Sequence, residues 1–430
     1  MSVAQLETWK LAHAYSRIGS GTTPTTSQDI YYTEPTDEDG VPWITTAELR
    51  ENYIENTSSR ITKEALKDFS TLRVYQSGSL FIAMYGATIG RLGISQVPAT
   101  CNQACCVLEK SAQFDNRFLF YWLWHRRADL VALSTGGGQP NLSQQDIREE
   151  RALCPPLETQ QRIARFLDEK TARIDGLIEK KRALLDRLAE QRQALITRAV
   201  TKGLKPDAPM KPSGIDWLGD IPAHWEMKRL RFLLNGGTLN GLYKSKEEFD
   251  PEGVPFVQMG EAFRSPVFSG GTEDRVVTSD EEKGKWGLRD GDFLIARRSI
   301  VFEGSGKSAM VVGVQEPHLF ESSMIRIRPS NPSDHSAFLS HFFQSCAGRA
   351  SFLAVTKRVT ISGIDSQQLK SVHIPVPPGS EAREIAAICE THERDAERVE
   401  REISTSIAQL AEYRSALITA AVTGQVADLA

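Results

Sequence analysis

The sequence predicts an α+β protein in which two globular domains alternate with two long helices, and the helices form an antiparallel coiled coil with pseudo-two-fold symmetry. Three observations lead to this prediction: an internal repeat, a heptad pattern in each repeated segment, and opposite charges on the two segments. Segments 155–201 and 377–423 are related by a shift of 222 residues, and 15 of 47 positions are identical without a gap. Such a repeat indicates one unit, a globule followed by a helix, present twice.

Length and composition favour two domains of ordinary globular type. The chain has 430 residues, of which 40% are hydrophobic and 25% charged, which is too long for a single core. The N-terminal residues MSVAQLETWK lack the apolar region of a signal peptide, and no stretch reaches the ~18 apolar residues of a membrane span. Six cysteines without zinc spacing favour a reducing cytoplasm and free thiols. The net charge of −4 argues mildly against nucleic acid when taken alone.

The two predicted globules, 1–154 and 215–376, share landmarks in the same order. The strand SGSLFIAMYG (77–86) matches DGDFLIARRS (290–299), and NLSQQDI (141–147) matches GIDSQQL (363–369). Trp9 is aligned with Trp225 at the start of each globule. Strands between turns rich in Gly and Asp, with a few helices, indicate α+β domains. A common frame with different inserts suggests one scaffold that displays two specificities.

An apolar helix is expected in each globule, RFLFYWLWHRR (117–127) in the first and HSAFLSHFFQS (335–345) in the second. The aromatic residues of the first helix could form a platform on which bases stack. Their helical spacing makes packing in the core the better interpretation, which leaves Arg126 and Arg127 as the plausible surface contacts.

The long helices are predicted over 155–204 and 377–426, and the first follows Pro155-Pro156 and ends near Gly203. Steps of four and three residues place apolar side chains at most a and d positions, which is typical of a coiled coil, although a solvated amphipathic face is the alternative. The predicted seam consists of Ile163, Leu167, Ile174, Leu177, Leu184, Leu188, Leu195, Ile385, Val399, Ile403, Leu410 and Leu417.

Charge and connectivity predict how the helices pair. The segment 156–204 has 11 basic and 7 acidic residues, and the segment 378–426 has 5 and 9, so unlike charges favour their pairing with each other. The first helix would be about 65–70 Å long, whereas the linker 205–214, rich in Pro and Lys, is expected to be extended and short. The second helix must therefore run back along the first.

Motifs that suggest catalysis are weak. GSGKS (304–308) resembles the end of a phosphate-binding loop, but Val301 stands where a glycine is required and the following AMVVGV predicts a strand rather than a helix. We interpret it as a turn that presents Lys307, with Arg91 at the matching place in the first globule. The eight histidines have no metal-ligand spacing. Nothing in the sequence assembles a catalytic centre or a metal site.

Five segments together resemble a known family. PPLETQQRIARFLDEKTARIDGLI (155–178) and PPGSEAREIAAICETHERDAERV (377–399) resemble the conserved helices of specificity subunits of type I restriction–modification enzymes. SGIDWLGDIPAHWEMKRL (213–230), GATIGRLGI (86–94) and CNQACCVLE (101–109) resemble motifs of that family's target recognition domains. The resemblance covers nearly the whole chain, although GSGKSAMV and FESSMIRI replace the inner motifs in the second globule.

The resemblance implies a subunit without a catalytic centre or cofactor of its own. It implies a complex with double-stranded DNA, two methylation subunits and two motor-nuclease subunits, and these partners would use S-adenosylmethionine, ATP and Mg²⁺. Each globule would read one half of an asymmetric bipartite DNA site, and the helix pair would set the spacer between the halves.

Candidate DNA contacts are basic residues for phosphates and polar residues for base edges. In the first globule they are Thr45, Thr46, Arg50, Tyr85, Thr88, Arg91, Gln103, Gln139 and Asn141. In the second they are Lys244, Arg264, Arg297, Arg298, Lys307, Lys357 and Arg358. Singly each could be merely solvated, whereas the group 297–298, 307 and 357–358 is the stronger prediction. A coiled-coil adaptor without DNA readout, an ATPase or nuclease using GSGKS, and a free-standing repressor remain as alternatives.

Overall fold

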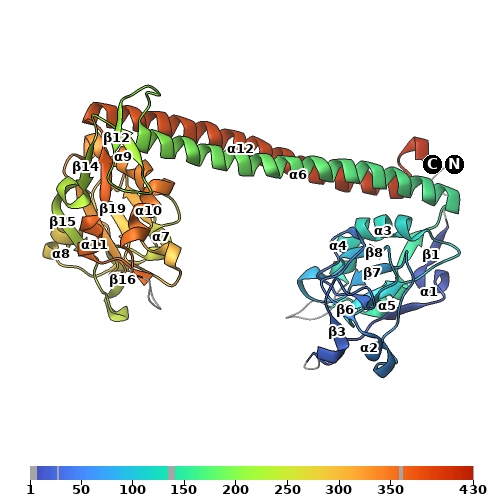
Figure 1. Ribbon diagram of the computed structural model, residues 1–430. Coiled ribbons are helices and arrows are strands. Elements are labelled where there is room, and N and C mark those ends of the chain that lie inside the picture. The colour runs from blue at the N-terminus through green and yellow to red at the C-terminus, as the bar shows by residue number, and fades with distance from the viewer. Residues whose placement is uncertain (1–6, 27–28, 134–140, 358–361, 430) are drawn as a thin grey trace. The chain divides into compact units, whose positions relative to one another are not determined.

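The computed structural model describes residues 7–26, 29–133, 141–357 and 362–429, and the chain divides into two compact units. Unit 1 comprises the chain up to Lys181 and the segment from Ser404, and unit 2 runs from Arg182 to Ile403. Two long helices are labelled in Figure 1, α6 (Leu157–Lys202) and α12 (Gly379–Val422). Each unit contains one globular lobe and one part of each long helix.

The lobe of unit 1 is built on small mixed sheets. Its central sheet has the order β2 (Ile18–Ser20), β10 (Cys105–Leu108), β7 (Leu80–Ala83), β8 (Leu92–Ser95), β5 (Asn52–Ile54). Neighbours in this sheet are antiparallel except β5 and β8, which are parallel. The other strands form one sheet and one pair, namely β3 (Tyr32–Thr33), β6 (Arg60–Ile61), β4 (Val41–Ile44) with β9 (Thr100–Cys101), and β1 (Thr8–Lys10) with β11 (Arg151–Leu153).

Short helices cover the sheets of unit 1. They are α1 (Leu11–Ala14), α2 (Lys63–Asp68), α3 (Asn116–His125), α4 (Arg127–Ala132) and α5 (Gln144–Glu149), with 3₁₀ turns η2 (Asp29–Tyr31), η3 (Gly86–Thr88) and η7 (Ala427–Leu429). Helix α3 starts where the Asp115 side chain accepts a hydrogen bond from the Arg117 backbone N–H (2.8 Å). It lies between the central sheet and α6 (Figure 1), and its residues 118–123 are buried. The core interpretation of this aromatic helix is therefore confirmed.

The lobe of unit 2 has the same plan. Its central sheet has the order β15 (Leu234–Asn240), β23 (Met324–Pro329), β19 (Phe293–Ala296), β21 (Ser308–Val311), β17 (Val267–Phe268). The other strands are β18 (Arg275–Val276), β16 (Phe249–Val257) and β22 (Leu319–Phe320) in one sheet, and the pairs β14 (Glu226–Arg229) with β25 (His373–Val376), β12 (Met210–Pro212) with β13 (Asp220–Pro222), and β20 (Arg298–Ser299) with β24 (Ser362–Gly363). The helices and turns are α7 (Met259–Ala262), α8 (Asp280–Trp286), α9 (Pro332–Gln344), α10 (Cys346–Val355), α11 (Ser366–Ser371), η4 (Leu230–Leu233), η5 (Lys246–Glu248) and η6 (Phe302–Gly304).

The two lobes agree in strand direction as well as in order. The edge pair β17–β21 is parallel, as is β5–β8, and β16–β22 is parallel, as is β4–β9. A close backbone approach is also shared: a Cβ on Gly21 would lie 1.6 Å from the Cys101 carbonyl oxygen, and one on Gly241 would lie 2.0 Å from that of Glu321. The repeat inferred from the helices therefore extends to the lobes.

The predicted equivalence of Trp9 and Trp225 is wrong by three residues. The Leu11 N–H donates to the Glu150 carbonyl oxygen just after β1, and the Leu230 N–H donates to that of Val372 just after β14. Trp9 is consequently equivalent to Lys228, three residues beyond Trp225. Backbone hydrogen bonds determine which positions are equivalent, and the two tryptophan side chains do not follow them.

Within each unit the two helix segments are antiparallel, as predicted. In unit 1 the Arg162 guanidinium donates to the Leu429 carbonyl oxygen (3.0 Å), and further along α6 Asp175 pairs with Arg414, earlier in α12. In unit 2 Arg192 pairs with Glu400 at 3.1 Å, and Ile196 shares a core with Ile385 and Cys389. The residue numbers of the contacting partners decrease along α12 as they increase along α6, which is the pattern of antiparallel helices.

The buried stripe of α6 departs from the predicted heptad seam. Ile163, Leu167 and Ile174 are buried, but Leu177, Leu184 and Leu195 are 43%, 51% and 48% exposed, and their neighbours Ile178 and Ile196 are buried instead. A straight helix drifts by about 20° per heptad from a strict 3.5-residue repeat, so the stripe moves by one residue. On α12 the predicted Ile385 and Ile403 are buried. The remaining seam residues are half-buried, namely Leu188, Val399, Leu410 and Leu417.

The predicted linker 205–214 is not a free extended spacer. It contains β12, which pairs with β13, and the flanking Leu218 and Ile221 belong to the core of unit 2. The hairpin forms because apolar side chains after the linker cover the end of α6, a contact that local sequence does not reveal. Of the helices described, none is long and apolar enough to cross a membrane.

Candidate nucleic-acid interface

The backbone of unit 2 brings most of the predicted basic group together. Arg298 in β20 pairs with Gly363 in β24, and the Lys357 N–H donates to the Gly363 carbonyl oxygen (3.1 Å). The Ala296 N–H donates to the Lys307 carbonyl oxygen (2.8 Å), which places Lys307 beside the start of β20. We call Arg297, Arg298, Lys307 and Lys357 the basic cluster. Arg358, predicted to belong to it, lies outside the described residues.

The charges of the basic cluster are largely available. Arg298, Lys307 and Lys357 are exposed and Arg297 is half-buried. Among the described residues no carboxylate lies within 4.0 Å of Arg297, Arg298 or Lys307, and Lys357 is 3.6 Å from Asp365. The Gln368 backbone N–H at the start of α11 is the main cause that holds the pKa of the Asp365 carboxyl below its usual value. Free cations on adjacent strands suit the phosphates of a nucleic acid.

Lys244 is an incorrect prediction as a DNA contact. Its side chain is only 5% exposed, and its Nζ lies 3.1 Å from carboxylate oxygens of both Glu248 and Glu282. Burial lowers the pKa of Lys244, but the hydrogen bonds to the two carboxylates outweigh burial and raise it. The ammonium group joins η5 to α8 and has no free face for a phosphate. Arg264, after α7, is exposed and stays a candidate.

In unit 1 the loop after β4 uses its polar groups to build a turn. Glu48 accepts hydrogen bonds from the Thr45 backbone and hydroxyl and from the Ser58 hydroxyl. Burial raises the pKa of Glu48, but these hydrogen bonds together outweigh it and lower the pKa. The Arg50 Nε donates to the Ala47 carbonyl oxygen (2.9 Å) and the rest of its side chain is exposed, while Thr46 is half-buried. Arg50 and Thr46 are left as possible contacts, whereas the Thr45 hydroxyl is already used.

Three other predicted contacts of unit 1, Tyr85, Thr88 and Asn141, lie at or beside η3. Tyr85 is 40% exposed and pairs through its backbone with Asn141, and the Thr88 hydroxyl donates to the Tyr85 carbonyl oxygen (3.3 Å). Gln103 is exposed and accepts a hydrogen bond from Thr23. Gln139 lies outside the described residues. Tyr85 and Asn141 thus form a polar rim of the lobe.

Arg91 and Lys307 occupy the same structural position in the two lobes. The Ala83 N–H donates to the Arg91 carbonyl oxygen (2.8 Å), as the Ala296 N–H does to that of Lys307. A glycine precedes each residue, and Gly90 and Gly306 have φ of +72° and +70°, which favours glycine. A strand, β21, follows Lys307. The turn interpretation of GSGKS agrees with this structure, since a phosphate-binding loop requires a helix at that point.

Arg91 is only half-buried, yet its Nε is buried and has no hydrogen-bond partner among the described residues. Lys307 has an exposed side chain. The same turn therefore presents a free cation in unit 2 and a partly enclosed one in unit 1.

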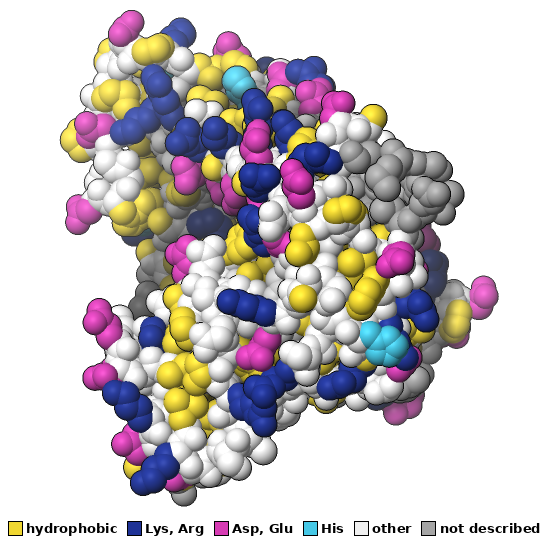
Figure 2. Space-filling view, turned by 90° about the vertical axis from the view of Figure 1, so that its right-hand side faces the viewer, with side chains coloured by type: hydrophobic (Ala, Val, Ile, Leu, Met, Phe, Trp, Pro, Cys, Tyr) yellow, Lys and Arg dark blue, Asp and Glu magenta, His cyan; other side chains and the backbone are white. Residues whose placement is uncertain are grey.

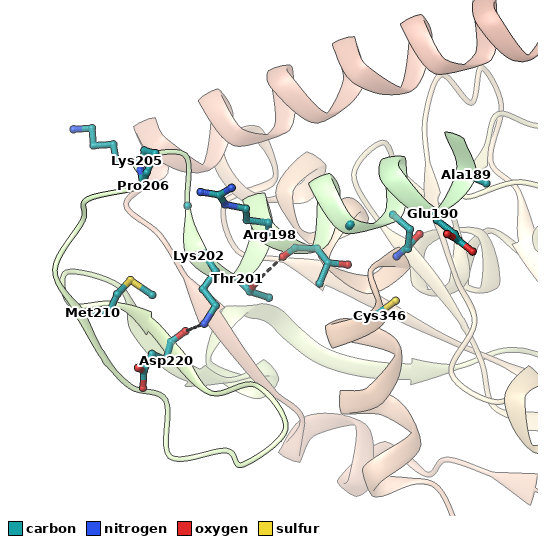
Figure 3. Close-up of a pocket in the computed structure, with 14 residues that line it drawn as sticks. Ala189, Glu190, Arg198, Thr201, Lys202, Lys205, Pro206, Met210, Asp220 and Cys346 are labelled. Atoms are coloured by element: carbon teal, nitrogen blue, oxygen red, sulfur yellow. Dashed lines mark hydrogen bonds between the residues drawn. The ribbon is translucent and has the colours of Figure 1, made fainter. Parts of the chain in front are cut away.

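A groove of about 1080 Å³ lies elsewhere in unit 2, along the last turns of α6 (Figure 3). It is lined by side chains of α6, the segment after it, β12, β13 and Cys346. Lys202 on its wall donates to the Asp220 carbonyl oxygen (2.8 Å). Among the described residues that line the groove there is no histidine, so Cys346 has no imidazole in the groove to act as a general base. In the described part of the chain no cluster of three His, Cys, Asp or Glu side chains is placed to hold a metal ion.

Charges are mixed on one face of the molecule. On the face drawn in Figure 2, Lys and Arg side chains are interspersed with Asp and Glu, in keeping with the net charge of −4. Attraction for a polyanion must therefore come from local groups such as the basic cluster rather than from the protein as a whole.

Ile300 and Val301 follow β20 in the loop that carries Arg297, Arg298 and Lys307, and neither is among the predicted DNA contacts. They are 90% and 61% exposed. A search for polar and charged residues cannot find them. Loop length is the feature of the sequence that could reveal them, because the segment between β19 and β21 is longer than the segment between the equivalent strands β7 and β8.

Comparisons with known proteins agree with this arrangement. A family model described as type I restriction modification DNA specificity domain matches residues 17–187 and 222–409. The chain is 20% identical over 348 residues to the type I restriction enzyme MjaVIII specificity subunit of Methanocaldococcus jannaschii, covering 80% of this chain and 77% of that one. It is 22% identical over 350 residues to the EcoKI specificity subunit of Escherichia coli K12, covering 79% and 72%.

Solved structures show the same fold. A chain of a type I R-M system superposes with a TM-score of 0.72 at 16% identity, covering 97% of both chains. The HsdS subunit from Thermoanaerobacter tengcongensis superposes with a TM-score of 0.55 at 16% identity, covering 98% and 97%. Since the family model matches most of the chain, once over each lobe with part of a long helix, the chain belongs to the type I restriction modification DNA specificity domain family.

Proposed function

We propose that this chain is the non-catalytic subunit that recognises a DNA sequence for a type I restriction–modification complex. The observation that carries the proposal is the pair of lobes with one strand order and unlike loops, because a repeated scaffold with different loops suits two different half-sites. The basic cluster in unit 2 supplies cations for phosphate contacts, and the polar rim around Tyr85 and Asn141 supplies groups for base edges.

The two long helices support the second part of the proposal, that the spacer between half-sites is set by α6 and α12. A continuous helix of 46 residues and one of 44 residues run from one unit into the other. A helix rises by about 1.5 Å per residue and B-DNA by about 3.4 Å per base pair, so a change in the length of both helices should change the spacer.

The family membership suggests which molecules this chain binds. We assign double-stranded DNA, two methylation subunits and two motor-nuclease subunits, with S-adenosylmethionine, ATP and Mg²⁺ used by those partners, in the cytoplasm. The exposed Leu177, Leu184 and Leu195 leave apolar surface on α6, which suits a protein partner.

The test is to express the full chain with its methylation subunits and to map methylated positions in the host genome by long-read sequencing. The expected result is a single bipartite site with two unlike halves and a constant spacer. The matched control expresses the methylation subunits without this chain, and it should leave the site unmodified. The adaptor alternative is favoured if modification does not depend on this chain, and a continuous or palindromic site contradicts the two-lobe assignment.

A further inference from the structure

In unit 1 the loop that follows β7 is short. The Leu142 N–H donates to the Met84 carbonyl oxygen (2.9 Å), and the next residue, Tyr85, pairs with Asn141. Tyr85 leads directly into the 3₁₀ turn η3, which starts at Gly86. The chain therefore passes from the strand pairing into the turn without an intervening residue.

The equivalent loop of unit 2 is longer. The Ile364 N–H donates to the Arg297 carbonyl oxygen (2.9 Å), and the next residue, Arg298, pairs with Gly363. Arg298 is thus equivalent to Tyr85. The 3₁₀ turn η6, however, does not start until Phe302.

The additional residues are Ser299, Ile300 and Val301. Both loops end at equivalent glycines, since the Gly90 N–H donates to the Ala83 carbonyl oxygen (2.8 Å) and the Gly306 N–H to that of Ala296 (2.9 Å). Unit 2 consequently carries a three-residue insertion at one place in an otherwise shared loop. We call residues 299–301 the insertion.

The base of the insertion is held in place. A Cβ on Gly304 would lie 2.0 Å from the Ser299 Oγ, so the absence of a side chain at Gly304 lets Ser299 pack against η6. The Arg349 guanidinium donates to the carbonyl oxygens of Glu303 (2.6 Å) and Ser305 (3.0 Å), which fixes the turn from the other side. Ile300 and Val301 project from this support, 90% and 61% exposed.

Exposure alone does not identify a site, because single apolar side chains are common on protein surfaces. Here two adjacent branched side chains occupy an insertion that the scaffold does not need, since unit 1 lacks it. The insertion directly follows Arg298 and lies in the loop that ends at Lys307, and neither cation has a carboxylate partner among the described residues. The side chain of Glu303 is exposed nearby and is the one acidic group within the loop.

We propose that Ile300 and Val301 enter the major groove of the half-site bound by unit 2 and contact the 5-methyl group of thymine. The inference rests on the proposed function and adds the kind of base feature that this lobe reads. The thymine methyl is the apolar feature that base pairs present in the major groove, and apolar side chains recognise it by contact. The flanking Arg298 and Lys307 would hold the backbone phosphates on either side of the inserted pair.

The experiment uses the full chain assembled with its methylation subunits and duplexes carrying the mapped site. Deoxyuridine replaces thymidine one position at a time in both half-sites, which removes only the methyl group. Binding by the unchanged protein should weaken about fourfold at one or two positions, all in one half-site, as expected for a methyl group that loses its contact. The double variant Ile300→Ala, Val301→Ala should bind thymidine duplexes as weakly as the unchanged protein binds the deoxyuridine ones.

Two further variants separate this effect from misfolding. Deletion of residues 299–301 restores the loop length of unit 1, so the protein should fold, lose the deoxyuridine effect and keep its salt dependence. Val277→Ala removes an apolar side chain of unit 2 that is 54% exposed outside the loop, and it should change nothing.

The proposal is overturned if the double variant keeps its sensitivity to deoxyuridine, or if the unchanged protein has none. Equal weakening on thymidine and deoxyuridine duplexes by the variant would instead indicate a wedge between base pairs and would also overturn it. A mapped site without thymine in either half would also overturn the proposal. If the assembled complex binds no specific duplex, the proposed function itself is wrong, so the two failures are distinguishable.

Discussion

The lobes of unit 1 and unit 2 share a scaffold but use charge differently around it. In unit 1 the two arginines at the junction of α3 and α4 are neutralised, in the pairs Arg127–Glu51 (3.2 Å) and Arg126–Glu150 (3.1 Å). In unit 2 Arg298 and Lys307 have no carboxylate within 4.0 Å among the described residues. Strand order depends on apolar faces and a few glycines, so loops can change charge and length without disturbing the sheet.

The lobes also differ in how they are fastened to the long helices. In unit 1 Asp168 of α6 accepts hydrogen bonds from Tyr53 (2.6 Å) and Tyr121 (2.9 Å) and lies 3.6 Å from the Arg117 guanidinium. In unit 2 the polar contacts of the lobe with α12 are distributed over three pairs, His224–Glu381 (2.7 Å), Asp334–Arg383 and His341–Glu393 (3.4 Å), beside an apolar contact. The lobe of unit 1 therefore depends more on a single polar residue.

The largest expected effect tests this difference in fastening. Asp168→Ala should lower the free energy of unfolding of unit 1 by about 2–3 kcal/mol, because Tyr53 and the buried Tyr121 both lose a charged acceptor and Tyr121 keeps only the Thr171 hydroxyl at 3.2 Å. Denaturant unfolding of the full chain, followed by near-UV circular dichroism, measures it. The matched change in unit 2, Glu393→Ala, should cost about 0.5 kcal/mol because that carboxylate is partly exposed. Equal losses would remove the distinction between the units.

The next effect concerns the free cations of unit 2. Arg297→Ala with Arg298→Ala should weaken DNA binding by the assembled complex about 30-fold at ~150 mM salt and reduce the slope of log K against log salt by about 2. A titration at several salt concentrations measures both quantities.

The control for that change lies in unit 1, where Arg126→Ala with Arg127→Ala removes two cations that are already paired. This variant should lower stability but leave the salt slope unchanged. If both double variants reduce the slope alike, the difference in charge availability between the lobes is unsupported.

Lys244 provides a smaller effect that sharpens the same point. Lys244→Met should lower the free energy of unfolding of unit 2 by about 1–2 kcal/mol, since Glu248 and Glu282 are left facing each other without the cation. The salt slope of DNA binding should stay at the value of the unchanged protein. A reduced slope with unaltered stability would restore Lys244 as a phosphate contact.

The smallest effect is a pH dependence confined to unit 1. The His125 Nδ1 lies 2.9 Å from the Thr419 Oγ1 of α12, and burial, helped by Arg126, lowers the pKa of His125 against the opposing effect of Asp129. The unfolded chain then binds the proton more readily, so stability falls as pH drops through about 6.5 and levels off below the folded-state pKa.

His125→Gln should flatten this dependence by less than about 0.5 kcal/mol, because the ring is only half-buried and screened by solvent. Thermal unfolding between pH 7.5 and about 5 measures it. An unchanged pH profile would assign the dependence to another group.

Prediction succeeded where local pattern and burial coincide. The apolar spacing of the aromatic helix placed α3 in the core. Opposite charges predicted that α6 and α12 pair, and the short connection after the first long helix predicted that they are antiparallel. The heptad seam failed at Leu177, Leu184 and Leu195 because a fixed repeat of 3.5 residues accumulates an angular error along a long straight helix. The linker is extended at β12, as predicted, but its pairing with β13 could not be predicted because it depends on residues beyond the linker.

For the candidate site, too, some residues could be predicted from the sequence and others could not. Residue type alone identified Arg297, Arg298 and Lys307, because exposed cations in turns are visible in the sequence. It could not distinguish them from Lys244, whose carboxylate partner Glu282 is 38 residues away. Which charges remain free is decided by long-range contacts.

The sequence by itself determined the duplicated architecture, the pairing of the long helices and the turns that carry Arg91 and Lys307, since these follow from periodicity, charge and glycine placement within short segments. Only the tertiary structure decided which face of α6 is buried, which cations are neutralised and that residues 299–301 are an insertion on a shared loop. Those outcomes depend on backbone contacts between residues far apart in the chain, and pattern within one segment does not record them.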